Sequence, residues 1–244
     1  MKVSTNMNKI KAIGFDLGHT LVDSKNPLNL QSLYDDALKD ILINCGIPEN
    51  VVMIDQAKNI LLKYNTRINH REHEVKSDDI FTEIFNRWGI EADNSVLNIA
   101  KRAFYDFIQN GCIPFDDTLP LLQKLKEKNI KTGILTDVAY GMDNCFSMRD
   151  IIPIERYMDI TLTSVDVGFR KPNSAGYLLL LKALQVKPEE MLFVGDEDKD
   201  IEGANAVNIP SVLINRDNKD KNYGQLFTVK SLTEVLSILC YQNC

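Results

Sequence analysis

The chain has 244 residues, of which 44% are hydrophobic and 25% charged, and its formal net charge is −6. This length suffices to bury a sizeable core, and the composition is that of a globular protein rather than a disordered or fibrous one. The negative balance argues against a broad surface for nucleic acid or anionic membrane, but it leaves room for a small anionic substrate at a local positive site.

The opening stretch, MKVSTNMNKIK, has neither an apolar segment nor a small-residue cleavage site. We therefore expect an untargeted, cytoplasmic protein. No apolar run approaches the roughly 20 residues that cross a bilayer, so no membrane partner is expected. The five cysteines are scattered and lack a CxxC pair, which favours reduced thiols that serve packing.

The first apolar run, Ala12–Phe15, predicts a buried strand that ends on a carboxylate, Asp16. After it, residues 29–109 show only the three- and four-residue apolar spacing of amphipathic helices. Four stripes have this spacing: Leu30, Leu33, Ala37, Ile41 and Leu42; Ala57, Ile60, Leu61 and Tyr64; Ile80, Phe81, Ile84, Phe85 and Trp88; and Ala100, Ala103, Phe104, Phe107 and Ile108. They predict a small helical bundle inserted after the first strand.

Beyond this insert, short apolar runs alternate with helical stretches. Runs without polar alternation are typical of strands buried on both faces of a parallel sheet, and the alternation with helices indicates a doubly wound α/β domain. The predicted strands are Thr132–Leu135, Ile160–Thr163, Met191–Val194 and Ser211–Ile214, and the predicted helices are Thr118–Lys128, Ala175–Leu184 and Ser231–Leu239. We expect residues 1–22 and 111–244 to form this core and residues 23–110 to form a helical cap domain.

Three of the predicted strands end on polar side chains, namely Asp16, Thr136 and Asp196. Ligands bind outside the carboxyl ends of the strands in open α/β sheets, so we expect these side chains at one edge of the sheet. A single acid at a strand end is equally well explained as a helix cap or a loop residue. Three such ends, together with the stretch GFRKP, favour a site.

The acidic residues at this edge suit phosphoryl transfer assisted by a cation. The carboxylate of Asp16 can attack phosphorus and form an aspartyl phosphate, and a divalent ion can screen the repulsion between the two anions. The stretch VGDEDKD offers Asp196, Glu197, Asp198 and Asp200 in one turn, and such oxygen ligands suit magnesium. The alternative is a solvated helix start, where acids favour the helix dipole.

Donors for a phosphate group follow in the chain. The hydroxyl of Thr136 can donate to a phosphate oxygen, and the backbone N–H of Asp137 can join it. Lys171 precedes Pro172, which favours an extended conformation for the lysine. A lysine held in this way can neutralise charge on both Asp16 and a phosphate, whereas the ordinary alternative is a surface lysine.

These residues fall in four motifs that occur in order: FDLGHTL, ILTD, GFRKP and VGDEDKDIEGA. In them the chain resembles the haloacid dehalogenase-like hydrolases over essentially its whole length, in the subfamily with a helical cap inserted after the first motif. The resemblance implies a Rossmann-like core and a cap that closes over the substrate, which we expect to be a small phosphorylated metabolite.

The resemblance also implies roles for individual residues. Asp16 would be the nucleophile, Thr136 would hold the phosphoryl group and Lys171 would stabilise charge. Magnesium would be bound by Asp16, the carbonyl oxygen of Gly18 and Asp196, with Asp200 assisting through the water shell of the metal.

Gly18 departs from the family pattern. Phosphatases of this family usually carry a second aspartate two positions after the nucleophile, which protonates the leaving group and then activates water. The chain could be a phosphatase that replaces this acid or works without it, a 2-haloacid dehalogenase, or a non-catalytic relative that binds a ligand or partner. Asp196 and Asp200 favour the phosphatase, because dehalogenation by a carboxylate needs no metal.

His19 lies beside Gly18, and its ordinary pKa near 6.5 suits proton transfer. We favour the simpler interpretation that His19 is a loop residue facing the substrate or the cap. In the cap, Arg67, His70 and Arg71 lie near the stretch NHREHE. An exposed polar turn is the default there, and the alternative is that one of these side chains selects the substrate.

Overall fold

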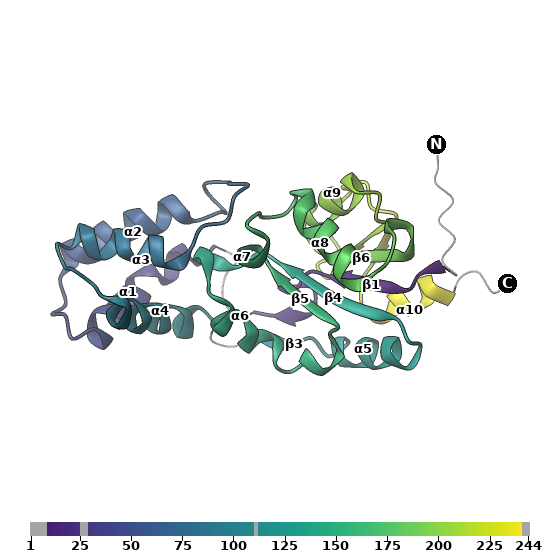
Figure 1. Ribbon diagram of the computed structural model, residues 1–244, viewed down its shortest axis with the longest axis horizontal. Helices are drawn as coiled ribbons and strands as arrows, with labels where there is room; N and C mark the ends of the chain where they lie inside the picture. Colours follow the sequence, from purple (N-terminus) through teal and green to yellow (C-terminus); the bar gives the residue numbers. More distant parts are fainter. Residues whose placement is uncertain (1–8, 25–28, 110–111, 241–244) are drawn as a thin grey trace. The chain divides into compact units, whose positions relative to one another are not determined.

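The computed structural model describes residues 9–24, 29–109 and 112–240 (Figure 1). They divide into two compact units. The α/β unit comprises the described residues of Met1–Asp23, Ile113–Asp137 and Ile151–Cys244, and the helical unit comprises those of Ser24–Cys112 and Val138–Asp150. The opening residues 1–8, the predicted boundary at 110–111 and Cys244 lie outside the described residues.

The α/β unit is built on a six-stranded sheet in which every paired neighbour is parallel. The strand order is β5-β4-β1-β6-β7-β8. The strands are β1 (Ala12–Phe15), β4 (Lys131–Thr136), β5 (Ile160–Thr163), β6 (Met191–Gly195), β7 (Ser211–Ile214) and β8 (Phe227–Val229). The five strands predicted from apolar runs are confirmed to within a residue at either end, whereas β8 was not predicted.

Helices cover both faces of this sheet (Figure 1). One face carries α8 (Ser174–Leu184) and α9 (Asp198–Ala206), and the other carries α5 (Thr118–Glu127) and α10 (Thr233–Cys240). Short helical segments α7 (Ser164–Val167), η4 (Glu155–Tyr157) and η5 (Pro188–Glu190) complete the connections. Helices on both faces of a parallel sheet confirm the predicted doubly wound, Rossmann-like core.

Two glycines let α8 approach the sheet closely. A Cβ atom at Gly14 of β1 or Gly133 of β4 would lie 2.8 or 2.7 Å from the side chain of Leu180, closer than real Cβ contacts come. Leu180 is fully buried in a core cluster that also contains Tyr177 and Phe193. The small residues in the central strands therefore set the depth at which the helix packs.

The helical unit confirms the four predicted amphipathic stripes. Its helices are η2 (Leu30–Leu33), α1 (Tyr34–Asn44), α2 (Val51–Tyr64), α3 (Ser77–Arg87), α4 (Asn94–Ile108), η3 (Ala139–Gly141) and α6 (Asn144–Ile151). The first stripe is divided, because Leu30–Leu33 forms a 3₁₀ turn ahead of α1. Helix α1 packs against α4, and α2 packs against α3.

The compact units differ from the predicted division over Val138–Asp150, which belongs to the helical unit rather than to the sheet. Contacts inside that unit explain the difference. The hydroxyl groups of Tyr140 and Tyr34 are hydrogen-bonded, and Tyr105 donates to the carbonyl oxygen of Tyr140 at 3.0 Å. The buried amine of Lys101 pairs with Asp143 at 2.9 Å.

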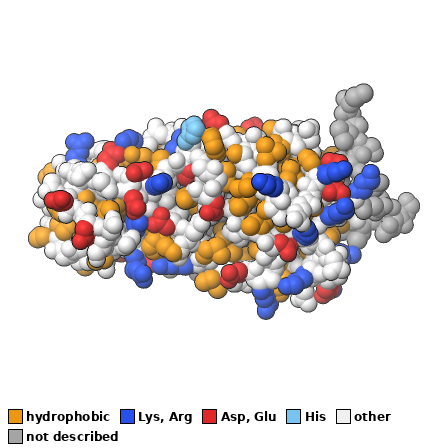
Figure 2. Space-filling model, viewed as in Figure 1, with side chains coloured by type: hydrophobic (Ala, Val, Ile, Leu, Met, Phe, Trp, Pro, Cys, Tyr) orange, Lys and Arg blue, Asp and Glu red, His pale blue; other side chains and the backbone are white. Residues whose placement is uncertain are grey.

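Three further features bear on the predictions. The two-residue strands β2 (Val22–Asp23) and β3 (Ile113–Pro114) pair antiparallel and were not predicted. None of the described helices combines the length and the apolar character needed to cross a membrane. On the face shown in Figure 2, acidic and basic side chains are interspersed, so this face has no broad patch of one charge.

Candidate active site

The carboxyl ends of three neighbouring strands meet at one edge of the sheet. In the register of the sheet, Phe15 of β1 lies beside Ile134 of β4 and Val194 of β6. Asp16, which follows β1, is therefore close in level to Thr136 at the end of β4 and to Asp196 just after β6. The predicted convergence of these polar strand ends is what the sheet topology produces.

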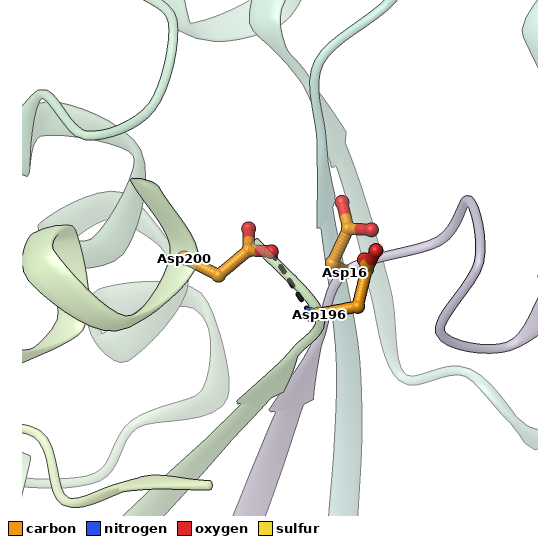
Figure 3. Close-up of side chains that lie close together, drawn as sticks. All are labelled: Asp16, Asp196 and Asp200. Atoms are coloured by element: carbon orange, nitrogen blue, oxygen red, sulfur yellow. Dashed lines mark hydrogen bonds between the residues drawn. The ribbon is translucent and has the colours of Figure 1, made fainter. Parts of the chain in front are cut away.

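Asp16, Asp196 and Asp200 form an acidic cluster at this edge (Figure 3). Each offers a carboxylate oxygen, and these oxygens all lie within 4.8 Å of one another. Two of the acids follow strands, and Asp200 comes from the first turn of α9. Its side chain accepts hydrogen bonds from the backbone N–H groups of Asp196 at 3.2 Å and Glu197 at 3.0 Å.

Lys171 joins the cluster from the motif GFRKP. Its amine is hydrogen-bonded to Asp16 and lies 2.6 Å from Oδ1 of Asp200, and its side chain is only 2% exposed. Burial alone would lower the pKa of Lys171, but Asp16 and Asp200 outweigh that effect and raise it well above its ordinary value. The lysine is therefore a permanent cation among the acids.

One lysine does not balance three carboxylates at this distance. Burial raises the pKa of Asp16 to about 6, against the attraction of Lys171. Burial and the charge of Asp16 raise the pKa of Asp196 to about 8. Both carboxyl groups are therefore harder to ionise than free aspartates, and a bound cation would relieve the repulsion.

The donor set fits a small divalent ion. Both oxygens of Asp200 are engaged, Oδ1 by Lys171 and Oδ2 by backbone N–H groups. Within residues 9–24, 29–109 and 112–240, nothing donates to Oδ2 of Asp16 or Oδ2 of Asp196. Hard carboxylate oxygens left in this way suit magnesium, whereas both oxygens of Asp200 already accept hydrogen bonds.

Two residues of this site were present in the motifs but were given no role by the sequence analysis. Thr20 is fully buried, and its hydroxyl donates to Oδ1 of Asp196 at 3.2 Å. Lys199 lies 3.1 Å from Oδ2 of Asp137 and 3.0 Å from Oε2 of Glu197. A threonine in a loop and a lysine in an acidic turn carry no signal in the sequence that distinguishes them from surface residues.

Asp137 lies among cations. Lys199 and Arg170 approach its carboxylate at 3.1 and 3.8 Å, and the backbone N–H of Lys171 donates to it at 3.0 Å. Burial alone would raise the pKa of Asp137, but Lys199, Lys171 and Arg170 outweigh it and hold the pKa below its ordinary value. Its side chain is therefore engaged in ion pairs, so a substrate contact would come from its backbone.

The remaining core residues of the prediction lie at the same strand ends. Thr136 is the buried last residue of β4. His19 follows Gly18 in the loop after β1, where its backbone has a left-handed φ of 56° and its N–H donates to the carbonyl oxygen of Val22 at 2.7 Å. At Gly18, an added Cβ would meet no atom within 4 Å.

The candidate specificity residues belong to the helical unit. Arg67 and His70 are exposed. Arg71 is more buried and donates to the carbonyl oxygen of Tyr64 at 2.7 Å and to Glu74 at 3.0 Å. The acidic cluster and Lys171 are assembled within the α/β unit, so a role for these three residues stays a prediction.

Comparison with known proteins identifies a matching protein family. The sequence model of the haloacid dehalogenase-like hydrolases matches residues 10–208. A glyceraldehyde 3-phosphate phosphatase of Methanopyrus kandleri is 27% identical, with 85% of this chain and 84% of that protein aligned. A phosphoglycolate phosphatase of Shigella dysenteriae is 26% identical over 84% of this chain and 82% of its own.

A solved structure shows the same fold. The 2-haloacid dehalogenase of Pseudomonas syringae pv. Tomato superposes with a TM-score of 0.68 at 22% identity, with 95% of this chain and 99% of that chain covered.

Proposed function

The chain belongs to the haloacid dehalogenase-like hydrolases, and from this premise we propose that it is a magnesium-dependent phosphatase of a small phosphorylated metabolite. The reaction would pass through an aspartyl phosphate. The observation that carries the proposal is the cluster of Asp16, Asp196 and Asp200 around Lys171, whose donor atoms fit a divalent ion. Curated relatives named as phosphatases support the substrate class.

Asp16 is the proposed nucleophile. Its carboxylate would form a bond to phosphorus while the bond from phosphorus to the leaving oxygen breaks. Water would then attack the aspartyl phosphate, release inorganic phosphate and regenerate the carboxylate. Lys171, fixed between Asp16 and Asp200, would neutralise charge on both nucleophile and phosphate, and Thr136 with the backbone N–H of Asp137 would hold the phosphate oxygens.

Magnesium would be held by Asp16, Asp196 and the carbonyl oxygen of Gly18, with Asp200 acting on its water shell. When bound, the ion would screen the charge between nucleophile and phosphate. The charges of the described ion-pair cluster support one divalent ion, because its carboxylates exceed its cations by two when all are ionised. The carboxylates are Asp16, Asp137, Asp196, Glu197 and Asp200, and the cations are Arg170, Lys171 and Lys199.

Because residue 18 is a glycine, the aspartate that usually protonates the leaving group is missing. The proton must then come from water, from the substrate or from another side chain, and His19 is the nearest candidate in sequence. A non-catalytic relative that binds a phosphorylated ligand is the second candidate function, and Gly18 is the observation that favours it. A dehalogenase would leave the cluster of Asp196 and Asp200 unexplained, and the dehalogenase structure at 22% identity speaks only for the fold.

A screen of product release separates these functions. The purified protein is incubated with a panel of phosphorylated metabolites that includes glyceraldehyde 3-phosphate and phosphoglycolate, and with 2-haloacids, each with magnesium and with a chelator. Phosphate release that requires magnesium and is lost in Asp16→Asn supports the proposal. Halide release would support the dehalogenase. Stabilisation by phosphate analogues without any release would support the non-catalytic relative.

A further inference from the structure

An arginine outside the four motifs is fixed in an unusual way in the α/β unit. Arg216 follows β7, and its guanidinium binds Asp117 through two hydrogen bonds of 2.9 and 3.0 Å. The same guanidinium lies 3.8 Å from the centre of the Phe115 ring. Asp117 also accepts from the backbone N–H of Leu232 at 2.8 Å. A two-point ion pair of this kind fixes orientation as well as distance.

Arg216 also contacts the loop that follows β1. Its Nη2 atom donates to the carbonyl oxygen of Thr20 at 3.0 Å. The next carbonyl, that of Leu21, accepts from the hydroxyl of Thr118 at 2.7 Å. The loop between the nucleophile and β2 is therefore anchored at two successive residues, Thr20 by Arg216 and Leu21 by Thr118 at the start of α5.

The anchored threonine is the one that contacts the acidic cluster. The hydroxyl of Thr20 donates to Oδ1 of Asp196 at 3.2 Å, while Oδ2 of Asp196 has no donor among the described residues. Asp117, Arg216, Thr20 and Asp196 are thus linked in series: Arg216 binds Asp117 and the backbone carbonyl of Thr20, and the hydroxyl of Thr20 binds Asp196. This series of contacts runs from a residue outside the site to a proposed metal ligand.

We propose that Arg216, held by Asp117, is a positioning residue for the cation: it fixes Thr20, whose hydroxyl orients the carboxylate of Asp196. This inference rests on the proposed magnesium site. Hydrogen bonds to a metal ligand fix its orientation, and their loss typically lowers metal affinity about 10–100-fold. Nε of Arg216 is buried without an acceptor among the described residues. The guanidinium is therefore held by its hydrogen bonds to Asp117 and Thr20.

A different result is expected if the ion pair of Arg216 with Asp117 is only structural. If Arg216 only ties β7 to α5, its loss lowers the stability of the fold and leaves the magnesium affinity of the folded protein unchanged. The test is therefore the magnesium dissociation constant, measured by isothermal titration calorimetry with magnesium chloride on metal-free protein whose folding is verified by circular dichroism.

We expect Arg216→Met to raise the dissociation constant for magnesium about tenfold or more. Thr20→Val keeps the shape of the side chain but removes the hydroxyl. It should raise the dissociation constant for magnesium by a similar factor. The double variant should bind magnesium no more weakly than the weaker-binding single variant, because both changes interrupt the same series of contacts. The magnesium concentration that gives half-maximal phosphate release should rise by the same factor.

Arg156→Met is the matched control. Arg156 is an exposed arginine of the same unit, and its guanidinium lies 4.8 Å from the centre of the Tyr157 ring. Its loss should leave magnesium affinity unchanged. If Arg216→Met does not fold, Arg216→Lys replaces it, since lysine keeps the charge but cannot bind Asp117 and Thr20 as a fork.

Two results would overturn the inference. Wild-type protein that binds magnesium, with a folded Arg216 variant or Thr20→Val binding it within twofold as tightly, would show that Arg216 does not act through Thr20 on the metal site. Wild-type protein with no measurable magnesium affinity would contradict the proposed function itself and the inference with it.

Discussion

Asp16 and Asp196 must lose their protons before they can bind a cation, and the structure makes that loss difficult. Because burial and the charge of Asp16 raise the pKa of Asp196 to about 8, this carboxyl is largely protonated at pH 6 in the metal-free protein. Magnesium must displace the proton. We predict that magnesium affinity increases between pH 6 and pH 8, by up to about tenfold per pH unit for one displaced proton.

Calorimetric titration with magnesium in buffers of different ionisation enthalpy measures both the affinity and the number of protons released. The affinity should level off above the pKa of Asp196, where no proton remains to be displaced. A constant affinity from pH 6 to pH 8 with no proton release would show that the cation does not bind at these carboxyl groups.

In the proposed mechanism, the glycine at position 18 affects both the formation and the decay of the intermediate. General acid–base catalysis is typically worth about 10²–10⁴ in rate, and nitrophenol is a leaving group that needs little help. We predict a burst of nitrophenol from p-nitrophenyl phosphate followed by slow turnover. Gly18→Asp should raise the steady-state rate, because it supplies the missing acid at a position where an added Cβ meets no atom within 4 Å.

Stopped-flow absorbance of nitrophenolate measures both phases, and Gly18→Asn is the control of similar size without an acid. If wild type shows no burst and Gly18→Asp is slower, another group already transfers the proton. His19→Ala, compared on alkyl and aryl phosphates, would then identify or exclude the neighbouring histidine.

At the scale of elements, β6 and α9 pack closely against each other at the site. A Cβ atom at Gly195 would lie 2.4 Å from the Cβ of Asp200 and 2.6 Å from its Oδ2. We predict that Gly195→Ala lowers the free energy of unfolding by about 1–3 kcal/mol, as overpacking usually does. Gly18→Ala, which has free space, should change it by less than about 0.5 kcal/mol.

Urea unfolding of the metal-free proteins compares these two variants, and the difference between them is the informative quantity. Equal stabilities would mean that α9 can move away from β6 without loss. The prediction of a close junction would then be wrong, and the fixed position of Asp200 with it.

The elements that the sequence predicts are those whose signal is local. Five strands and four amphipathic stripes follow from continuous or periodic apolar residues. Strand β8 does not, because Phe227–Val229 is short and only Val229 is buried. The place of Val138–Asp150 in the helical unit rests on contacts such as that of Tyr140 with Tyr34, which are 106 residues apart. No local pattern encodes such a pairing.

The residues of the candidate site also fall into those that the sequence predicts and those that it does not. Asp16, Thr136 and Asp196 are predictable because strand ends in a parallel sheet share an edge. Thr20 and Arg216 are not predictable, because their importance comes from hydrogen bonds between loops 196 residues apart. Lys199 is recognisable only once Asp137 is seen beside it.

At the scale of the whole molecule, the chain is acidic overall but collects three cations at one edge of its sheet. The family match over residues 10–208 covers the helical insert and strands β1, β4, β5 and β6 of the sheet, and it ends before β7. The proposed function depends on one chemical event, the transfer of a phosphoryl group to Asp16.

Mass spectrometry of acid-quenched protein tests that event most directly. The wild type, mixed with p-nitrophenyl phosphate and magnesium and quenched during the burst, should carry one phosphoryl group, and peptide mapping should place it on Asp16. The Asp16→Asn protein should carry none and release no phosphate. Phosphate release by wild type without a phosphorylated Asp16, or undiminished release by Asp16→Asn, would contradict the proposed transfer of the phosphoryl group to Asp16.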